Sequence, residues 1–246
     1  LLKNSIMSIV QSIFADYYEP SIYKLHPRPS VIENVNKVIL CCNPSHGGAM
    51  YGCPHCGNLK LVPFRCKSRF CPSGGNKYNQ LRSFHMSCKL VSCVHRHCVF
   101  TIPAELRVYF LDDRTLLDCL FHSVRDVVLR MFSKMNKTEN FTPGLICVLH
   151  TFGRDLKWNP HVHALFTEGG IDREQKWFKK LDYIPYKYLR KSWQKQVLDI
   201  IKNNFKDNET KRLINKLYSK YKEGFYVNAQ RDLTNISLYV VIVTKK

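Results

Sequence analysis

The chain has 246 residues, of which 45% are hydrophobic and 23% charged, so it can bury a core and is not expected to be disordered. Its net charge is +19, from 38 Lys and Arg against 19 Asp and Glu, and this excess favours a nucleic-acid partner over a merely basic protein. No apolar run approaches the roughly 20 residues that cross a bilayer, and the sequence carries no amphipathic or lipidated anchor, so we expect no membrane partner.

Cysteine usage indicates a reducing compartment. There are 11 cysteines, no signal peptide is evident, and six of the cysteines fall within residues 41–71 in a pattern typical of metal sites. We therefore expect a soluble intracellular protein. The chain begins with Leu1 and stops at Lys245-Lys246 directly after an apolar run, from which we expect a fragment of a longer reading frame.

Two amphipathic helices are predicted at the start of the chain. Apolar residues recur at helical spacing over residues 5–18, and Pro20 is expected to end that helix. Ser30 and Glu33 form a capping-box pattern that opens a second helix over residues 30–39. We interpret both apolar stripes as core.

A cysteine block with metal-ligand spacing follows. Cys53 and Cys56, followed by Gly57, have the spacing of a zinc knuckle, whose turn aims two thiolates at one point. Cys66 and Cys71 would complete the tetrahedral set that structural zinc requires, with a short strand over residues 59–64 between the two pairs. A redox-active cysteine pair is the alternative, but no thioredoxin-like βαβ pattern surrounds it. Further candidate ligands nearby are Cys41, Cys42, His46 and His55.

Basic residues surround this cysteine block and alternate with aromatic residues. Such a pattern suits a nucleic-acid surface, where cations contact phosphates and rings stack on bases, although a solvated face beside a small core is the alternative. Residues 76–90 are predicted to form a short basic helix. The candidate DNA-binding residues are Arg65, Lys67, Arg69, Lys77 and Arg82, and the aromatic residues are Phe64, Phe70 and Tyr78.

The rest of the chain predicts an antiparallel sheet with covering helices. Residues 145–151 and 160–167 are predicted strands that form an antiparallel hairpin, ending at Glu168-Gly169-Gly170. Residues 95–102 form a further strand that Pro103 stops. The other expected elements are helices over residues 116–131, 186–205 and 211–221, a short strand over 225–227, and a strand or helix over 235–243.

The strand over residues 160–167 carries two candidate metal ligands. His161 and His163 are two residues apart, so both imidazoles are expected on one face, with Val162 on the other. Two neutral imidazoles on one face can bind a divalent metal ion. The alternative is one hydrogen-bonded core histidine and one solvated histidine.

Taken together, these motifs resemble those of the HUH-type, two-tyrosine rolling-circle transposases of bacterial insertion sequences, which are relatives of Helitron transposases and plasmid replication initiators. The resemblance rests on the cysteine block 53–71 continuing into Gly75-Asn76-Lys77, on residues 97–103, on residues 159–163 and on Ser237-Leu238-Tyr239. It implies an α+β fold, in which an N-terminal helical, zinc-ribbon-like module over residues 1–90 precedes an HUH-nuclease-type antiparallel sheet covered by helices over residues 91–246.

The same resemblance implies a mechanism. His161 and His163 would hold Mg²⁺ or Mn²⁺, with His97 as the expected third ligand because its strand could lie next to residues 160–167. Tyr239 would attack a phosphodiester of single-stranded DNA, leaving a 5′-phosphotyrosine and a free 3′-OH. The metal is needed because a phenol with a pKa near 10 is a poor nucleophile towards an anionic phosphate. Rival candidates for the third ligand are His95, His150 and Glu168.

Three features depart from the family pattern. Gly74 stands where the family usually has a cysteine, Ile242 and Val243 stand where it tends to have Arg-Tyr, and the chain stops at residue 246 where the family continues. We therefore expect a truncated DNA-binding transposase of the bacterial cytoplasm, with structural Zn²⁺ and catalytic Mg²⁺ or Mn²⁺. Two other functions fit the sequence: a zinc-dependent DNA-binding protein without catalysis, and a plasmid rolling-circle replication initiator.

Overall fold

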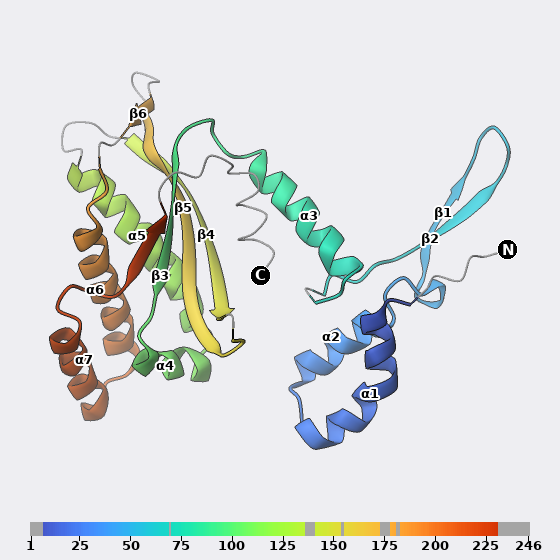
Figure 1. Cartoon of the computed structure of the whole chain (residues 1–246), viewed down its shortest axis with the longest axis horizontal. Helices are drawn as coiled ribbons and strands as arrows, with labels where there is room; N and C mark the ends of the chain where they lie inside the picture. Colours follow the sequence, from blue (N-terminus) through green and yellow to red (C-terminus); the bar gives the residue numbers. More distant parts are fainter. Residues whose placement is uncertain are drawn as a thin grey trace. The chain divides into compact units, whose positions relative to one another are not determined.

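The computed structural model describes residues 7–68, 70–135, 141–153, 155–172, 178–180 and 183–230. Their helices and antiparallel sheets confirm the α+β class (Figure 1). The chain divides into two compact units between Cys88 and Lys89. In this described part of the chain, no helix is both long and apolar enough to span a bilayer.

The first unit combines helices with a two-stranded antiparallel hairpin. The predicted strand over residues 59–64 and the predicted basic helix over residues 76–90 are both confirmed, with slightly different bounds. Its elements are α1 (Ile9–Leu25), α2 (Pro29–Ile39), the 3-10 turn η1 (Pro44–His46), β1 (Gly48–Gly52), β2 (Leu59–Pro63) and α3 (Gly74–Ser87).

The core of the first unit is small. Val10 and Phe14 of α1 pack against it, but the interpretation of the whole α1 stripe as core is wrong, because Ile9 is 80% and Tyr17 68% exposed. So little buried apolar surface leaves a unit of this size dependent on a metal ion or another cross-link for its stability. Within the described residues, the buried cluster consists of Val38, Cys41 and Cys71.

The structure corrects the predicted end of the first helix and the predicted start of the second helix. Helix α1 passes through Pro20 and continues to Leu25, and His26, which adopts the left-handed conformation, is its C-cap. A proline removes one backbone donor without stopping the next turn, and the Ser21 hydroxyl donates to the Tyr17 carbonyl at 2.7 Å. Helix α2 starts at Pro29, whose fixed φ suits a first helical position, so the capping box expected at Ser30 does not form.

The second unit is a five-stranded antiparallel sheet with helices. The strand order is β4-β5-β3-β7, and β6 pairs with β5. Its elements are β3 (His95–Thr101), the 3-10 turn η2 (Ala104–Leu106), α4 (Arg107–Asp112), α5 (Leu116–Met135), β4 (Phe141–Phe152), β5 (Trp158–Asp172), β6 (Phe178–Lys180), α6 (Tyr186–Asn204), α7 (Asn208–Lys220) and β7 (Val227–Gln230).

The strand pairing confirms the predicted hairpin. Strands β4 and β5 are antiparallel neighbours, and β3 pairs with the other edge of β5. The prediction that Glu168-Gly169-Gly170 ends the hairpin is wrong, because β5 stays paired with β4 as far as Asp172 and also pairs with β6 over residues 169–171. The short strand expected over residues 225–227 instead begins at Val227.

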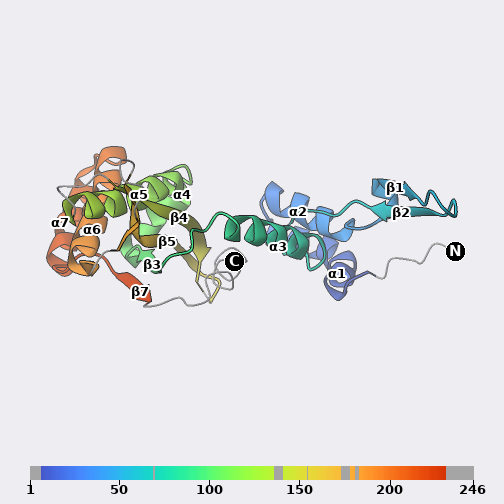
Figure 2. The ribbon, with the colours of Figure 1, turned by 90° about the horizontal axis from the view of Figure 1, so that it is seen from above.

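Helices cover one face of this sheet (Figure 2). Helix α5 packs across β4 and β5, and α6 packs against α5 and β7. The strands contribute Phe100, Val162 and Phe166 to this core, all fully buried. The Trp193 indole of α6 packs edge-on against Phe100 and donates to the Thr101 carbonyl at 2.8 Å. The opposite face of the sheet therefore carries the other alternate residues of β3, β4 and β5.

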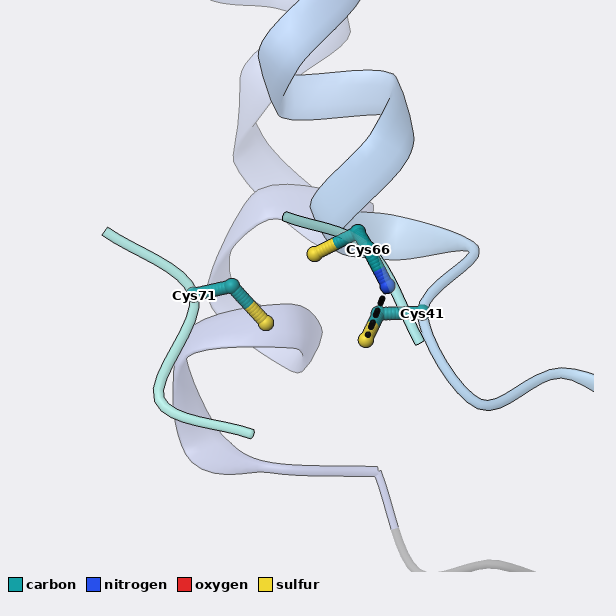
Figure 3. A group of neighbouring side chains, drawn as sticks. All are labelled: Cys41, Cys66 and Cys71. Atoms are coloured by element: carbon teal, nitrogen blue, oxygen red, sulfur yellow. Dashed lines mark hydrogen bonds between the residues drawn. The ribbon is translucent and has the colours of Figure 1, made fainter. Parts of the chain in front are cut away.

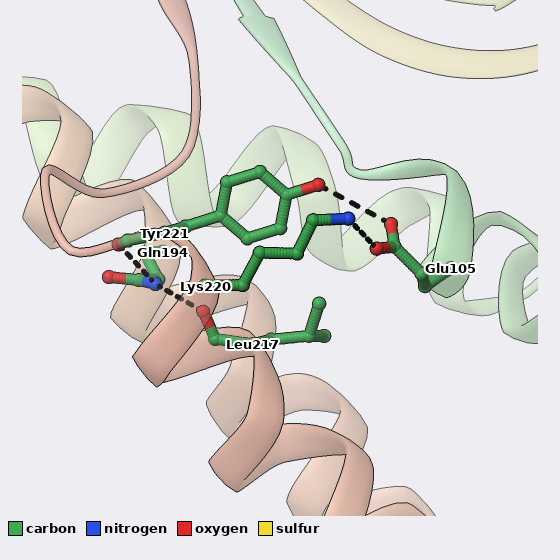
Figure 4. Close-up of polar contacts among 5 residues, drawn as sticks. All are labelled: Glu105, Gln194, Leu217, Lys220 and Tyr221. Carbon is green, nitrogen blue, oxygen red and sulfur yellow. Dashed lines mark hydrogen bonds and ion pairs between the residues drawn. The ribbon is translucent and has the colours of Figure 1, made fainter.

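Polar contacts secure the end of α7 (Figure 4). The Lys220 ammonium lies 2.5 Å from a carboxylate oxygen of Glu105, and the Tyr221 hydroxyl donates to the other oxygen at 3.5 Å. The buried Gln194 amide donates to the carbonyls of Tyr221 at 3.1 Å and Leu217 at 3.5 Å. These bonds tie the C-terminal end of α7 to α6 and to η2, shortly before the chain enters β7.

Candidate metal centres and family

A group of histidines lies on the sheet face away from the helices. His161 and His163 share one face of β5, as predicted, while Val162 and Ala164 are buried on the other face. The register of β4 places His150 opposite His161, and residues opposite each other in an antiparallel pair share a face. One ring nitrogen from each of these three histidines lies within 4.8 Å of those of the other two. The group therefore has the donor set of a divalent-metal site.

Hydrogen bonds orient the two rings of β5. The Nδ1 atom of His161 lies 2.7 Å from the Asn159 carbonyl oxygen, so this nitrogen donates and the lone pair is on Nε2. The Nδ1 atom of His163 lies 3.0 Å from Nε2 of His97. In the tautomer that donates from Nδ1, His163 also presents its Nε2 lone pair. Such a bond from the far ring nitrogen is what metal-ligating histidines usually make.

His97, the expected third ligand, lies beside this group. Its strand does pair with β5, and its ring stacks on His163 with centroids 5.1 Å apart. Among the described residues, however, the atoms within ligand distance belong to His150, whose ring centroid lies 4.1 Å from that of His163. The two remaining candidates contact different groups. The Nδ1 atom of His95 lies 2.8 Å from the Cys93 carbonyl oxygen, and Glu168 forms a buried ion pair with Arg96.

A second candidate centre lies in the first unit. Cys41, Cys66 and Cys71 gather around one point, with their sulfur atoms within 4.8 Å of one another (Figure 3). Cys41 follows α2, and the buried Gln11 amide holds this position by donating to the carbonyls of Val38 at 3.1 Å and Cys41 at 2.8 Å. Thiolates in this arrangement are the ligands that structural zinc prefers.

The surroundings of Cys66 and Cys71 shift the pKa values of the two thiols in opposite directions. Burial raises the pKa of Cys66 to about 12. Burial acts in the same direction on Cys71, but backbone donors, led by the Gly74 N–H at 3.2 Å, outweigh it and lower the pKa of Cys71. Gly74 is the first residue of α3, so the positive end of the helix faces this sulfur.

The structure does not bring the four predicted zinc ligands together. Cys66 and Cys71 belong to the group with Cys41, whereas Cys53 and Cys56 lie in the turn between β1 and β2. That turn has the expected knuckle form: Cys53 accepts from the backbone N–H groups of Cys56 and His55, which lowers the pKa of Cys53. The predicted four-cysteine set stays a prediction, and the geometry favours two separate thiol groups.

The predicted DNA-binding residues are partly described. Arg65, Lys67, Lys77 and Arg82 are exposed, as are the aromatic rings among them, with Phe64 60% exposed. Arg69 lies outside the described residues, and so does Tyr239, the predicted nucleophile.

Cys41 and His150 are the functional candidates to which the sequence reasoning gave too little weight. Cys41 directly follows a predicted helix and lies far from the knuckle in sequence, so spacing alone does not link it to Cys66. His150 lies in the strand predicted to pair with residues 160–167. A correct register for that pair would have placed it opposite His161.

The fold and the two centres together define a class: a strongly basic α+β protein with a thiolate group in one unit and an imidazole group on the sheet of the other. A family described as a transposase zinc-binding domain matches residues 9–102, which contain the thiolate group. A second family, described as a putative transposase, matches residues 144–238, which contain His150, His161 and His163.

Two bacterial proteins show the same relationship. The transposase for insertion sequence element IS801 of Pseudomonas savastanoi pv. phaseolicola is 33% identical over 172 residues, which cover 69% of this chain and 40% of that protein. The putative transposase y4qJ of Sinorhizobium fredii is 23% identical over 169 residues, which cover 68% of this chain and 42% of that protein. No solved structure matches the chain.

By these matches the chain is similar to insertion-sequence transposases, and its N-terminal part is similar to their zinc-binding domain. The matched segment spans about two fifths of the length of these two relatives.

Proposed function

We propose that this chain acts in DNA transposition by nicking and rejoining a single DNA strand, with the histidine group of the sheet as its catalytic metal centre. The observation that carries the proposal is the approach of ligand atoms from His150, His161 and His163 to within 4.8 Å, in a segment that matches a putative transposase family. Both relatives are bacterial, which supports action in the bacterial cytoplasm.

His150, His161 and His163 would hold the divalent ion, and of Mg²⁺ and Mn²⁺ we expect Mn²⁺ to bind better, because Mg²⁺ prefers oxygen ligands to imidazoles. Bound there, the ion would polarise the scissile phosphate and stabilise the charge that develops on it. His161 and His163 are held for this role by the Asn159 carbonyl and by His97. His97 then acts as a positioning residue for His163.

Tyr239 is the proposed nucleophile. Its phenol loses a proton to solvent, and the oxygen attacks phosphorus. The bond from phosphorus to the 3′ oxygen breaks, and that oxygen takes up a proton. The products are a 5′-phosphotyrosine and a free 3′-OH, and the covalent link keeps the bond energy needed for rejoining.

The first unit is proposed to bind the DNA. Four of its five predicted DNA-binding side chains are exposed beside exposed aromatic rings, as suits a strand whose phosphates are neutralised and whose bases stack. We propose that residues 1–90 act as this module and residues 91–246 as the nuclease. The structural zinc of the first module would be held by Cys41, Cys66 and Cys71, and the pair Cys53 and Cys56 would supply a second thiol site.

A cleavage assay tests the proposed chemistry. The purified chain is incubated with Mn²⁺ and a pool of end-labelled, single-stranded oligonucleotides of randomised sequence, and covalent adducts are resolved on a denaturing gel. We expect an adduct that disappears in Tyr239→Phe, in His161→Ala and in His163→Ala. The matched control is His122→Ala, because His122 is an exposed histidine of α5 outside the group.

The outcomes separate the candidate functions. If no adduct forms while salt-sensitive DNA binding survives the histidine substitutions unchanged, the chain is a zinc-dependent DNA-binding protein without chemistry. An adduct that persists in His161→Ala would remove the metal centre from the mechanism. A replication initiator would share the chemistry, but both relatives are named as transposases, which favours transposition.

A further inference from the structure

We propose that Cys42 is the fourth thiolate ligand of the zinc ion held by Cys41, Cys66 and Cys71. Two consecutive cysteines would then bind one ion. The inference rests on the structural zinc proposed for the first unit and assigns the position that completes its shell.

The need for a fourth ligand follows from the geometry. Three thiolates leave one corner of the zinc tetrahedron open, and structural zinc sites are closed by protein ligands. With zinc–sulfur bonds of about 2.3 Å, two ligand sulfurs of one tetrahedron lie about 3.8 Å apart. The sulfur atoms of Cys41 and Cys42 are 3.8 Å apart. The separation of these two sulfur atoms therefore matches the distance expected between two ligands of one zinc ion.

The backbone at Cys42 makes this approach possible. Side chains of consecutive residues diverge in extended or helical chain, so two neighbours rarely reach one ion. Cys42 instead adopts φ = 65°, in the left-handed region that residues with a side chain seldom occupy. The N–H of Cys42 donates to the Phe64 carbonyl at 3.1 Å, which ties this turn to the segment leading into Cys66. Such strain is typical of functional positions.

Other residues are less suited to the fourth corner. Gly74 donates its N–H to the Cys71 sulfur, but a Cβ atom there would lie 2.0 Å from the Cys66 carbonyl oxygen, so no side chain can enter from this position. His46 lines the same hollow as Cys41 and Cys66. In the described part of the chain, neither His46 nor Cys42 belongs to the group whose ligand atoms all lie within 4.8 Å of one another. Cys42 is the better candidate because its sulfur lies 3.8 Å from that of Cys41 and it packs, half-buried, against the cluster.

The test isolates this group from the second thiol pair. All variants carry Cys53→Ser and Cys56→Ser, so that the measured metal binding comes from the proposed centre and not from the second thiol pair. Zinc affinity is measured by competition with a chromophoric chelator, and the number of thiolates is read from the charge-transfer and ligand-field absorption of the Co²⁺-substituted chain. The matched control is Cys88→Ser, because Cys88 is an exposed cysteine of the same unit.

We expect Cys42→Ser to weaken zinc binding by more than about tenfold, since loss of even an outer-shell partner costs about 10- to 100-fold. The Co²⁺ charge-transfer band should fall while the tetrahedral ligand-field bands persist, which shows that the site still folds. Cys42→His should restore affinity with one thiolate fewer.

Two results would overturn the inference. Equal zinc affinity and equal Co²⁺ spectra in Cys42→Ser and Cys88→Ser would mean that Cys42 is not a ligand, and loss of binding in His46→Ala would then assign the corner to His46. If the chain without these substitutions binds no zinc, both the structural zinc and the role of Cys42 are wrong.

Discussion

At the scale of single residues, two histidines of the sheet are candidates for the third metal ligand beside His161 and His163. His97 is the candidate chosen from the sequence, and His150 is the one whose ligand atom lies with those of His161 and His163. Both come from strands that neighbour β5, one on each side. The position of the strand therefore does not distinguish His97 from His150 as the third ligand. The positions of their ring nitrogens do, and they favour His150.

Metal titration separates the two roles. If His97 only positions His163 through the 3.0 Å contact, His97→Ala should weaken Mn²⁺ binding by about 10- to 100-fold. His150→Ala, which removes a direct ligand, should cost more. The measurement is Mn²⁺ affinity by isothermal titration or by electron paramagnetic resonance. Full loss in His97→Ala with little change in His150→Ala would make His97 the direct ligand.

At the scale of elements, the two faces of β5 have different roles: one packs in the core, and the other carries the candidate metal ligands. Its even-numbered residues from Val162 to Phe166 are buried against the helices, while its odd-numbered residues carry the imidazoles. The core that supports this strand includes Phe100 of β3, packed edge-on against Trp193 with ring centroids 5.4 Å apart. The rigidity of the site therefore depends on packing on the far face of the sheet.

Truncation of the Phe100 side chain should lower the free energy of unfolding of the second unit. Phe100 is fully buried, so Phe100→Ala should destabilise the second unit by about 3–5 kcal/mol, the cost of lost burial and of the cavity left behind. Urea unfolding followed by near-ultraviolet circular dichroism measures this change. Val108→Ala on α4 is the control, because Val108 is 52% exposed and should shift the midpoint little.

The cap of α7 should make stability depend on pH. Asp207 accepts from the Thr210 N–H at 2.7 Å, and this bond lowers the pKa of Asp207 below its ordinary value of 3.8. Its contribution is complete above the unfolded-state pKa and is lost as pH falls through the lower folded-state pKa. Asp207→Asn keeps an acceptor but cannot titrate, so its stability relative to the native chain should improve below about pH 4.

Urea midpoints at neutral and acidic pH test this linkage. Asp207→Ala removes the cap at every pH and should be the least stable of the three chains at neutral pH. A constant difference between the native chain and Asp207→Asn from neutral to acidic pH would contradict a titrating cap.

At the scale of the whole molecule, the net charge of +19 is the dominant feature. Binding of single-stranded DNA should weaken steeply with salt, by about 0.7 in the logarithmic slope for each phosphate neutralised. Lys77→Gln combined with Arg82→Gln should reduce that slope. Lys220→Gln is the control, since Lys220 is paired with Glu105 in the second unit. Binding by fluorescence anisotropy across a salt series gives the slopes, and an unchanged slope would exclude Lys77 and Arg82 from the interface.

The two units differ in how much their sequences could predict. In the second unit, strong periodicity predicted most helices and strands, and the alternation in β5 predicted that His161 and His163 share one face of the strand. In the first unit, local signals misplaced the end of α1 and the start of α2. Tertiary contacts decide helix ends when, as here, the buried apolar surface is small and propensity is weak.

By itself the sequence determined the local patterns: the basic charge, the paired imidazoles of β5, the knuckle at Cys53 and Cys56, and the α+β order of elements. These depend on residue type and spacing along one element, which the backbone geometry converts directly into a shared face or a turn. Only the tertiary structure decided which ligands share a centre, joining Cys41 to Cys66 and Cys71, and His150 to His161 and His163. Those groupings depend on strand register and on the packing of segments far apart in the chain, and neither is encoded in the spacing of any one motif.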